Sequence, residues 1–575
     1  MEKVWLKEYE KGVPATIDYP KVPVHRFLED SAAKYPSRTA LIYGNVVEPL
    51  GGRLMDATMS YGRLLELTRR FAATLQGLGV KKGDRVAIHL PNCPQFVIAY
   101  YATLMVGAIV VPCNPQYTPR EMMHQLRDSG AKVAVTLSLT YPVVKQIRKE
   151  TALEAVVVAN VKEYFPGLLK FLFTVAKEKK EGHFQDLTGE VNTYWFQDLL
   201  AKAPAQPQPV EVTPEDTAVL MYTGGTTGVS KGAQLTHRNL VANAIQVRSW
   251  MPSLQVEKET VLTSLPLFHS FGMTVCMNLA TYLCGTMILI PNPRILEHTL
   301  KSINKHKPTV FPGVPALYVS LTNRPDIREY DVSSIKACIS GAAGLPAEVQ
   351  ESFEKLTGGK LVEGYGLSEA TPVTHCNPIY GKRKQGSWIG LPMPDTVATI
   401  RDLEMGETDL GPGDIGELCI QGPQVMKGYW NMPTETANTL RDGWLHTGDI
   451  ARMDTDGFFQ IVDRKKDMIL GAGGFNIYPR DVEEVLYEHP KVMEAAVAGV
   501  PMGADKGERV KAYVVLKPGE TATEEEIIDF CRKNLAPYKV PKFVEFRADL
   551  PKTMVGKILR RVLIEEELKR SQGQG

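Results

Sequence analysis

Residues 222–232 read Tyr222-Thr223-Gly224-Gly225-Thr226-Thr227-Gly228-Val229-Ser230-Lys231-Gly232. Glycines let a backbone adopt φ > 0 and bring N–H groups close to an anion, while threonine hydroxyls and a lysine add donors and positive charge. We therefore predict a loop that binds the phosphates of ATP. A P-loop NTPase would need G-x-x-x-x-G-K-[ST], whereas here Ser230 precedes the lysine and Gly232 follows it. A flexible Gly/Thr turn without a ligand is the alternative.

The segments before this loop predict an α/β protein. Residues 217–221 are apolar and predict a strand that ends at the loop. Further toward the N-terminus, helix and strand patterns alternate, which is typical of a sheet that is covered by helices on both faces. The expected helices are 61–78, 95–106 and 120–129, and the expected strands are 85–90, 108–112 and 132–136.

The composition indicates a large globular protein with more than one domain. A chain of 575 residues is too long for one compact core, and its 44% hydrophobic content is enough to build several. Lys and Arg total 66 against 65 Asp and Glu, so no broad basic field exists and we expect no nucleic-acid binding. The eight cysteines are scattered without a C-x-x-C pair, which predicts reduced, mostly buried thiols in a cytoplasmic protein.

Neither secretion nor a membrane span is expected, because Met1 to Lys7 lack a signal-peptide core and no run reaches about 18 apolar residues. Residues 164–182, however, place an apolar cluster among Lys170, Lys177, Lys179 and Lys180. Two interpretations stay open. The segment is either an amphipathic surface that rests on a membrane, or a helix that packs on its own domain with solvated lysines.

Three further motifs have side chains suited to a nucleotide. Residues 340–344 (SGAAG) follow a predicted strand at 335–339 and leave room for a flat ligand beside bare backbone. Residues 363–369 (EGYGLSE) combine an aromatic ring that can stack on a purine with a carboxylate that can bind Mg²⁺. Asp449 lies in a Gly-bearing turn, where it can accept hydrogen bonds from a ribose. Core packing of Tyr365 and a solvated turn at Asp449 are the alternatives.

The order of these motifs resembles the adenylate-forming superfamily of acyl-CoA synthetases, luciferases and adenylation domains, and the resemblance runs nearly end to end. Within that superfamily the chain is most similar to bacterial or archaeal fatty-acid CoA ligases of the medium- to long-chain type. Ser230 stands where many members have proline, so we expect a looser loop that keeps its phosphate donors. The resemblance rests on residues 222–232, 340–344, 365–369, 447–449, 463–467 and 551–557.

The resemblance implies an α/β fold with two domains and a two-step reaction. Layered α/β sheets at 1–463 would bind ATP and the acyl group, and a small mobile α+β domain at 464–575 would carry the catalytic lysine. A fatty carboxylate would attack Mg·ATP to give acyl-adenylate and pyrophosphate, and the thiol of coenzyme A would then release AMP. ATP, Mg²⁺ and coenzyme A are thus expected, and a monomer and a homodimer are both compatible with the sequence.

The resemblance also implies a role for each site residue. Lys557, Thr226, Glu369 and His269 are the expected catalytic residues, and Lys557 would stabilise charge at the α-phosphate. Thr226 and Glu369 would bind magnesium, and Lys466 would be the hinge between the domains. Thr223, Gly224, Gly225, Thr227, Gly228 and Lys231 would bind phosphates, Gly341, Ala342, Ala343 and Tyr365 would frame adenine, Asp449 and Arg464 would bind ribose, and Gly473 and Gly474 would face the pantetheine chain. Glu363, Gly364, Gly366 and Ser368 are further expected cofactor-binding residues.

The acyl pocket is expected beside residues 265–272 (LPLFHSFG). An adenylation domain for amino acids usually has an aspartate here to pair with the substrate ammonium, so its absence favours an uncharged acyl tail. His269 would orient the carboxylate or gate the tunnel, and a structural histidine is the alternative. Three rival functions remain, namely an aryl-acid ligase, a fatty-acyl-AMP ligase and a non-enzymatic lipid-binding protein.

Overall fold

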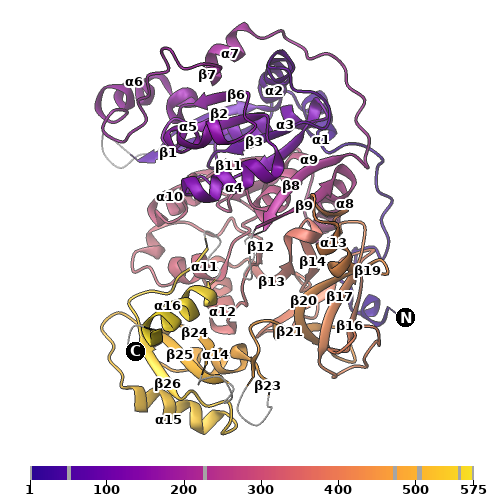
Figure 1. Cartoon of the computed structure of the whole chain (residues 1–575), viewed down its shortest axis with the longest axis vertical. Helices are drawn as coiled ribbons and strands as arrows, with labels where there is room; N and C mark the ends of the chain where they lie inside the picture. Colours follow the sequence, from indigo (N-terminus) through magenta and orange to yellow (C-terminus); the bar gives the residue numbers. More distant parts are fainter. Residues whose placement is uncertain are drawn as a thin grey trace.

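The computed structural model describes residues 3–47, 54–223, 230–470, 476–501, 508–553 and 558–572. Figure 1 shows a large part formed by most of the chain and a small part at its lower end that holds the C-terminus. The predicted α/β architecture with a large N-terminal and a small C-terminal domain is confirmed. The division expected after residue 463 falls inside strand β21 (Phe459–Arg464), one residue before its end.

The strands on either side of residues 224–229, β8 and β9, belong to an eight-stranded sheet with the order β18-β9-β8-β4-β3-β5-β6-β7. From β8 to β7 neighbouring strands run parallel, and they read as short apolar runs because helices cover both faces. The strands are β3 (Arg85–His89), β4 (Ile109–Pro112), β5 (Val133–Leu137), β6 (Ala155–Ala159), β7 (Thr193–Trp195), β8 (Thr217–Thr223), β9 (Lys231–Thr236) and β18 (Gly428–Tyr429).

The helices predicted in this region are present, and they begin and end where local chemistry dictates. Thr118 and Glu121 exchange side-chain and backbone hydrogen bonds in a capping box that starts α4, and Gly130 ends this helix in the left-handed conformation. The six elements predicted between residues 61 and 137 are confirmed, with ends that shift by a single residue. The helices are α2 (Tyr61–Gly77), α3 (Pro94–Met105), α4 (Pro119–Ser129), α5 (Tyr141–Ile147) and α7 (Phe196–Lys202).

Two more sheets complete the large part. A four-stranded sheet has the order β10-β11-β1-β2, and a nine-stranded sheet has the order β12-β13-β14-β15-β21-β20-β17-β16 with β19 beside β20. Their strands are β1 (Thr39–Val47), β2 (Leu54–Ser60), β10 (Thr260–Thr263), β11 (Thr286–Leu289), β12 (Ala337–Ser340), β13 (Lys360–Gly366), β14 (Val373–Cys376), β15 (Trp388–Pro392), β16 (Val397–Arg401), β17 (Gly416–Gln421), β19 (Leu440–Arg441) and β20 (Trp444–Met453). The helices around them are α1 (Arg26–Lys34), α8 (His237–Trp250), α9 (Leu279–Tyr282), α10 (Leu296–His306), α11 (Pro315–Thr322), α12 (Ala347–Thr357) and α13 (Pro433–Thr439).

The small part has a hydrophobic core of its own, centred on the buried faces of β24, β25 and α14. Its polar contacts with the large part include those of Arg480 with Glu363 at 3.8 Å, of the Arg480 backbone N–H with Asp463 Oδ2 at 2.9 Å, and of Glu484 with Ser387. Its elements are β22 (Ile469–Leu470), β23 (Asn476–Ile477), α14 (Pro479–Tyr487), β24 (Val492–Pro501), β25 (Glu508–Leu516), α15 (Glu524–Asn534), β26 (Phe543–Phe546) and α16 (Arg560–Gln572).

Helix α6 (Gly167–Ala176) resolves the segment at 164–182 into two apolar stripes. Leu169 and Phe173 are buried, and the Phe173 ring lies edge-on to Phe165 with centroids 5.6 Å apart. Leu168, Phe171 and Val175 are 59, 63 and 72% exposed and lie on another face at i, i+3 and i+7 spacing. One stripe therefore anchors the helix on its own domain, and the second faces solvent.

All eight cysteines are buried free thiols, as predicted. Among the described residues, no helix is long and apolar enough to cross a membrane.

Candidate active site

The loop at 224–229 joins two antiparallel strands in a β-hairpin, with Thr223 opposite Lys231. This strand–loop–strand arrangement differs from the strand–loop–helix of P-loop NTPases. Ser230 Oγ donates a 2.6 Å hydrogen bond to the carbonyl oxygen of Thr223, and the Ser230 carbonyl lies 3.0 Å from His124 Nε2. These contacts hold Ser230 itself, and the loop that was expected to be looser lies outside the described residues. The predicted phosphate residues Gly224, Gly225, Thr226, Thr227 and Gly228 lie outside the described residues.

Lys231 lies at the start of β9 and faces a pocket of about 350 Å³. Its ammonium forms an ion pair with Glu435 of α13 and lies 5.2 Å from the centre of the Tyr429 ring. Glu369, Tyr429 and Thr447 also line the pocket. The structure thus brings the predicted phosphate, magnesium and ribose segments together around one cavity.

Glu369 lies in a single 3₁₀ turn, Ser368–Ala370, directly after β13. Its Oε1 accepts a 2.8 Å hydrogen bond from the hydroxyl of Tyr429. Burial, together with the charge of Glu369, raises the pKa of Tyr429, so this phenol stays a donor. Among the described residues, no group of three His, Cys, Asp or Glu side chains could hold a metal. One carboxylate beside a triphosphate suits Mg²⁺, because that ion takes few protein ligands and the rest from phosphate and water.

The predicted adenine segment after β12 is open to solvent. Ala342 has φ of 70° and is exposed, as is Ala343, whereas Gly341 is buried. A side chain at Gly341 would meet the Phe271 ring at 2.9 Å, and one at Gly344 would meet the guanidinium of Arg480 at 2.0 Å. The acyl segment and the small domain therefore both reach this loop.

The residues at 363–366 have packing roles that the sequence did not reveal. A Cβ at Gly364 would lie 2.7 Å from the Ile339 side chain, and one at Gly366 would lie 2.0 Å from the carbonyl oxygen of Pro372. Glu363 is buried and accepts the backbone N–H of Leu345 at 3.1 Å, and burial raises its pKa to about 7. None of these three residues lines the pocket beside Lys231, and Ser368 Oγ lies 3.4 Å from Ser270 Oγ.

Asp449 is buried within strand β20 rather than in the turn expected from the sequence, and it joins two of the predicted nucleotide residues. Its Oδ2 accepts the Tyr365 hydroxyl at 2.5 Å, and its Oδ1 lies 3.0 Å from Arg464 Nε. Burial and the Asp449 charge raise the pKa of Tyr365, and the same charge raises the pKa of Arg464. Each carboxylate oxygen has two lone pairs, so Asp449 keeps acceptor capacity for ribose hydroxyls.

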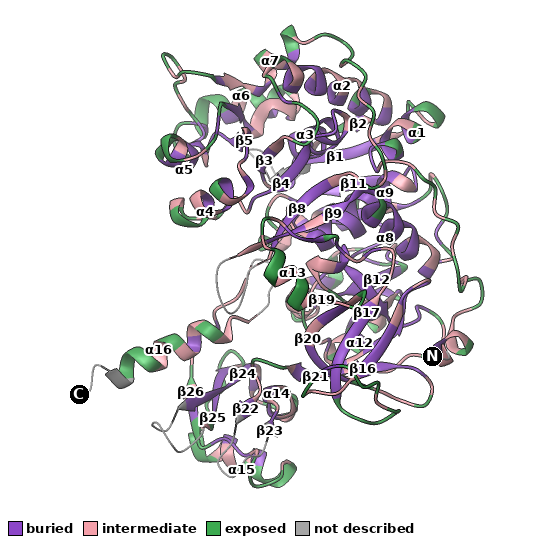
Figure 2. Ribbon diagram, turned by 45° about the vertical axis from the view of Figure 1, so that its right-hand side comes forward, coloured by how far each residue is buried: buried purple, intermediate pink, exposed green. Residues whose placement is uncertain are grey.

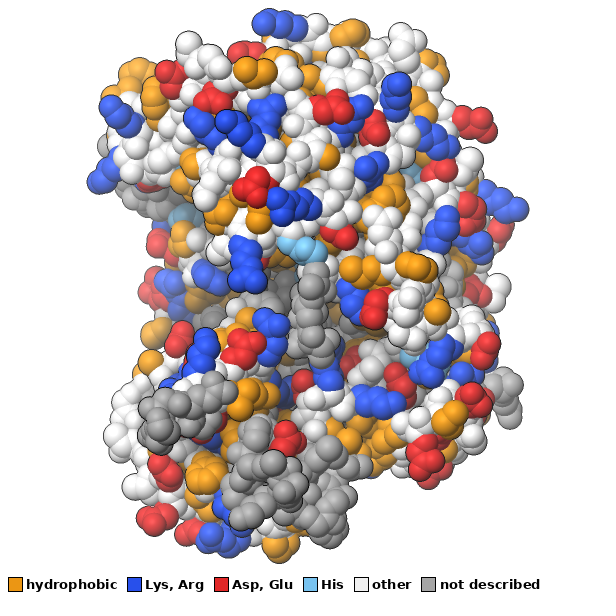
Figure 3. Space-filling model, viewed as in Figure 1, with side chains coloured by type: hydrophobic (Ala, Val, Ile, Leu, Met, Phe, Trp, Pro, Cys, Tyr) orange, Lys and Arg blue, Asp and Glu red, His pale blue; other side chains and the backbone are white. Residues whose placement is uncertain are grey.

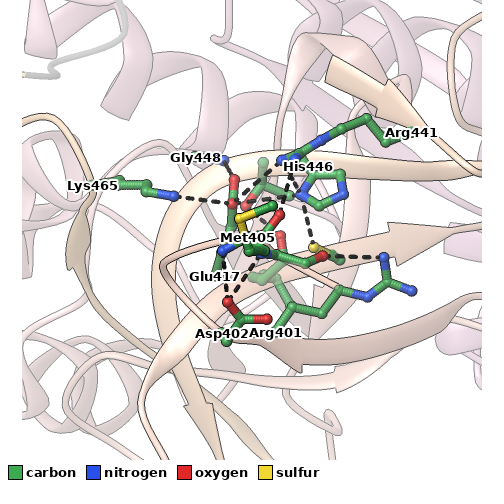
Figure 4. A network of polar contacts seen from close by, with 12 residues as sticks. Arg401, Asp402, Met405, Glu417, Arg441, His446, Gly448 and Lys465 are labelled. Atoms are coloured by element: carbon green, nitrogen blue, oxygen red, sulfur yellow. Dashed lines mark hydrogen bonds and ion pairs between the residues drawn. The ribbon is translucent and has the colours of Figure 1, made fainter. Parts of the chain in front are cut away.

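A second polar network, which the sequence did not reveal, contacts strand β20 at Gly448, next to Asp449 (Figure 4). Glu417 Oε1 accepts the backbone N–H of Gly448 at 3.0 Å, and its Oε2 lies 3.6 Å from Lys465 Nζ. His446 Nδ1 lies 2.8 Å from Arg441 Nη2, and burial with the nearby Arg441 charge lowers the pKa of His446. Glu417 therefore connects the backbone of Gly448, next to Asp449, with Lys465, the residue after Arg464. A buried glutamate in an alternating strand was the only sequence signal for it.

The expected hinge residue, Lys466, lies in an exposed turn after β21. The residues before it are fixed to the large domain, because Lys465 N–H donates to the Gly448 carbonyl oxygen at 3.0 Å and Arg464 binds Asp449. Gly473, Gly474 and Lys557 lie outside the described residues. Lys552 and Ile558, which flank the expected catalytic lysine, form an antiparallel bridge.

His269 lies beside the nucleotide segments at the entry to a π-helical turn, Gly272–Asn278. Its Nδ1 accepts the backbone N–H of Phe271 at 3.2 Å, which places the ring proton on Nε2. Leu265, Leu267 and Phe271 are buried around it, and π-helical turns are frequent at functional sites. A larger hollow of about 650 Å³ lies elsewhere, at residues 34–39, and contains none of the predicted site residues.

Comparisons with known proteins agree with this arrangement. A family model described as AMP-binding enzyme matches residues 28–430, and one described as AMP-binding enzyme C-terminal domain matches residues 481–557. A long-chain-fatty-acid–CoA ligase from Bacillus subtilis (strain 168) is 49% identical over 98% of both chains.

Two solved structures are similar over nearly the whole chain. The anthranilate CoA ligase AuaEII in complex with anthranoyl-AMP has a TM-score of 0.82 at 26% identity, covering 96% of this chain and 98% of the other. ATP-bound MatB from Rhodopseudomonas palustris has a TM-score of 0.80 at 29% identity, covering 95% of this chain and 99% of the other.

Proposed function

Since the chain belongs to the AMP-binding enzyme family, we propose that it is an ATP-dependent fatty acid:CoA ligase that forms acyl-CoA, AMP and pyrophosphate through an acyl-adenylate. The observation that carries this proposal is the convergence of Lys231, Glu369 and Thr447 on one pocket beside Asp449. The 49% identity to a long-chain-fatty-acid–CoA ligase supports the same reaction. ATP, Mg²⁺ and coenzyme A are its cosubstrates and cofactor.

In the first step, a carboxylate oxygen of the fatty acid attacks the α-phosphorus of ATP, the bond to the β-phosphate breaks, and pyrophosphate leaves. We assign Lys231 to the β- and γ-phosphates and Lys557 to the charge that develops at the α-phosphate. Magnesium, when bound, would neutralise charge on the phosphate oxygens. Glu369 and Thr226 are assigned to hold that ion, and Asp449 and Arg464 to hold the ribose.

In the second step, the thiol of coenzyme A attacks the acyl carbon, the thiol proton is released, and AMP leaves. We propose that the part of the C-terminal domain that follows Lys466 rotates about this residue between the steps, which carries Lys557 away and brings Gly473 and Gly474 to the pantetheine chain. The contacts of Arg464 and Lys465 support a pivot at this point. A rotation that starts after them leaves the ribose contacts intact.

The substrate class follows from the segment at 265–272, which has no acidic residue and buries Leu265, Leu267 and Phe271. An apolar, uncharged acyl tail fits such a wall. His269 is assigned to orient the carboxylate.

Pyrophosphate release across fatty acids of increasing length, with and without coenzyme A, tests the reaction and its substrate together. We expect release with fatty acids, with AMP release that depends on coenzyme A. Preference for aromatic acids would favour an aryl-acid ligase, and adenylate that coenzyme A does not consume would favour a fatty-acyl-AMP ligase. No pyrophosphate with any acid would leave only lipid binding.

Glu369→Gln is expected to raise the magnesium concentration for half-maximal activity about tenfold or more, because a neutral amide is a poorer Mg²⁺ ligand than a carboxylate. A magnesium titration of pyrophosphate release measures this shift. Tyr429→Phe is the control, because it removes the hydrogen bond to Glu369 but keeps the carboxylate. An unchanged magnesium dependence in Glu369→Gln would remove this residue from the metal site.

We also propose that α6 rests on a membrane surface, where a long-chain acid accumulates. Leu168, Phe171 and Val175 form an exposed apolar stripe, and Lys170 and Lys177 are exposed residues of the same segment that lie outside this stripe. Figure 3 shows orange apolar side chains beside blue basic ones at the upper left, where Figure 1 places α6. Lysines beside an apolar helix face match an anionic lipid interface.

Replacing Leu168, Phe171 and Val175 with serine is expected to weaken binding to anionic vesicles at least about tenfold, because each apolar side chain loses its burial in the lipid interface. Turnover of acid presented in a bilayer should fall, and turnover of a short soluble acid should hardly change. Cosedimentation should also weaken as salt screens the lysines.

The matched control replaces Val256, Ile415 and Leu568, which are exposed apolar residues outside α6, with serine. Phe173 is unsuitable for this test, because it is buried and its loss would disturb the domain. Equal vesicle binding by the α6 variant and the control would contradict a membrane role.

A further inference from the structure

We propose that Glu435 is an internal placeholder for the phosphates of ATP: it pairs with Lys231 in the free enzyme and must be displaced when the triphosphate binds. This inference rests on the proposed function, because it assigns Lys231 to the β- and γ-phosphates. It adds a residue that controls how the enzyme discriminates ATP from AMP. The observation behind it is the direct ion pair between Glu435 and the lysine of the phosphate loop.

The geometry places Lys231 in the nucleotide pocket, and Glu435 reaches the Lys231 ammonium from α13 without itself lining that pocket. Lys231, Glu369 and Tyr429 line the same cavity, and Asn438 and Thr439 of α13 form its wall beside them. The Tyr429 ring lies under the Lys231 ammonium, and its hydroxyl binds Glu369. The Glu435 carboxylate therefore lies against the Lys231 ammonium, where an anionic ligand of this lysine would bind.

Charge makes the two occupants exclusive. A triphosphate brings several negative charges to Lys231, and a carboxylate left beside it would repel them over a few ångströms. The compact lysine ammonium has three donors, and those that point at Glu435 become available to phosphate only when the carboxylate leaves. AMP lacks the β- and γ-phosphates, so AMP binding does not require Glu435 to leave Lys231.

Helix α13, which carries Glu435, can move when a ligand displaces this side chain. None of the residues of α13 is buried, and Figure 2 shows this helix largely in green at the edge of the large domain. Its main tether in the described chain is Thr436, whose Oγ1 accepts the backbone N–H of Tyr429 at 2.9 Å. The side chains of Lys231 and Glu435 are 29 and 43% exposed, so the pair is only moderately stable in water.

A position in the first helical turn offers a structural explanation for Glu435, since a carboxylate there stabilises the helix dipole. That explanation predicts a change in stability but no change in the ratio of ATP to AMP affinity. Binding measurements therefore distinguish the helix-dipole explanation from the placeholder.

The test measures binding of Mg·ATP and of AMP by calorimetry, without fatty acid or coenzyme A, to the full chain. Glu435→Gln is expected to tighten Mg·ATP binding about three- to tenfold and to change AMP binding less than about twofold. In a Lys231→Met background, Glu435→Gln should lose most of this gain. Glu215→Gln, which makes the same charge change at an exposed pair with Arg238, should have no effect.

An unchanged or weaker affinity for Mg·ATP in Glu435→Gln would overturn the placeholder, as would an equal change for ATP and AMP. Retention of the full gain without Lys231 would also overturn it, because simple repulsion of the triphosphate would then explain the effect. Absence of ATP binding and ligation in the wild type would instead refute the proposed function. Normal ligation with an unchanged affinity ratio refutes the placeholder alone.

Discussion

Replacing Lys557 with alanine is expected to lower the rate of acyl-adenylate formation at least about a hundredfold, because the transition state at the α-phosphate loses an electrostatic partner. Thioester formation from supplied acyl-adenylate should stay within a fewfold of the wild type. The residue is assigned to only one orientation of the small domain, so its loss should affect only one half-reaction. Pyrophosphate release measures the first step, and coenzyme A-dependent AMP release from acyl-adenylate measures the second.

Lys552→Ala is the matched control for this variant. Lys552 precedes the same turn, but its ammonium forms an ion pair with Glu494 within the small domain. We expect both half-reactions to stay close to the wild type in this control. An equal loss of both half-reactions in Lys557→Ala would contradict an orientation-specific role.

The architecture could be predicted from the sequence because each element satisfies its own local rule. The strands at 85–89 and 133–137 are short and are centred on the apolar residues 86–88 and 133–135, which is typical of buried parallel strands. Helix α4 is bounded by a capping box and by Gly130, both visible in the sequence. The ordered motifs then indicated a nucleotide site, since Lys231, Glu369 and Asp449 combine a cation, a metal ligand and a hydroxyl acceptor.

The rest could not be predicted, because it depends on contacts between segments far apart in the chain. Glu435 reads as a first-turn helix residue until β18 pairs with β9 and brings α13 to Lys231. Glu417 reads as one polar residue in a strand until β20 places Gly448 against it. The reason for a glycine is equally hidden in the sequence. At Gly366 the backbone of Pro372, rather than a ligand, leaves no room for a side chain.

The segment at 164–182 shows how periodicity alone left two interpretations open. The apolar positions predict an amphipathic helix, and Phe173 and Phe171 contribute equally to that pattern. Only the tertiary structure separates them, because Phe173 is 5% exposed and Phe171 is 63% exposed. The helix packs on its own domain through one stripe and exposes a second apolar stripe to solvent, and contact of that second stripe with a membrane stays a proposal.

Asp449→Asn is expected to slow both half-reactions about a hundredfold or more, in contrast to Lys557→Ala. The AMP moiety is bound in both steps, and a carboxylate that accepts hydrogen bonds contributes about 1.5–3 kcal/mol for each of them. Asparagine has nearly the size of aspartate, so the fold should survive although Arg464 loses its charged partner. Thermal unfolding of the variant checks that it does. The same two assays measure the effect, with nucleotide affinity as a third readout.

The effect of Asp449→Asn should be specific to its position in the pocket. Asp409→Asn is the control, because Asp409 also pairs with an arginine, Arg401 at 3.3 Å, but is 47% exposed and is not among the residues that line the pocket. We expect this control to keep both half-reactions near the wild-type rates. A loss confined to adenylation in Asp449→Asn would mean that the carboxylate acts on the triphosphate rather than on the ribose, because only the ribose contact is needed again when coenzyme A displaces AMP.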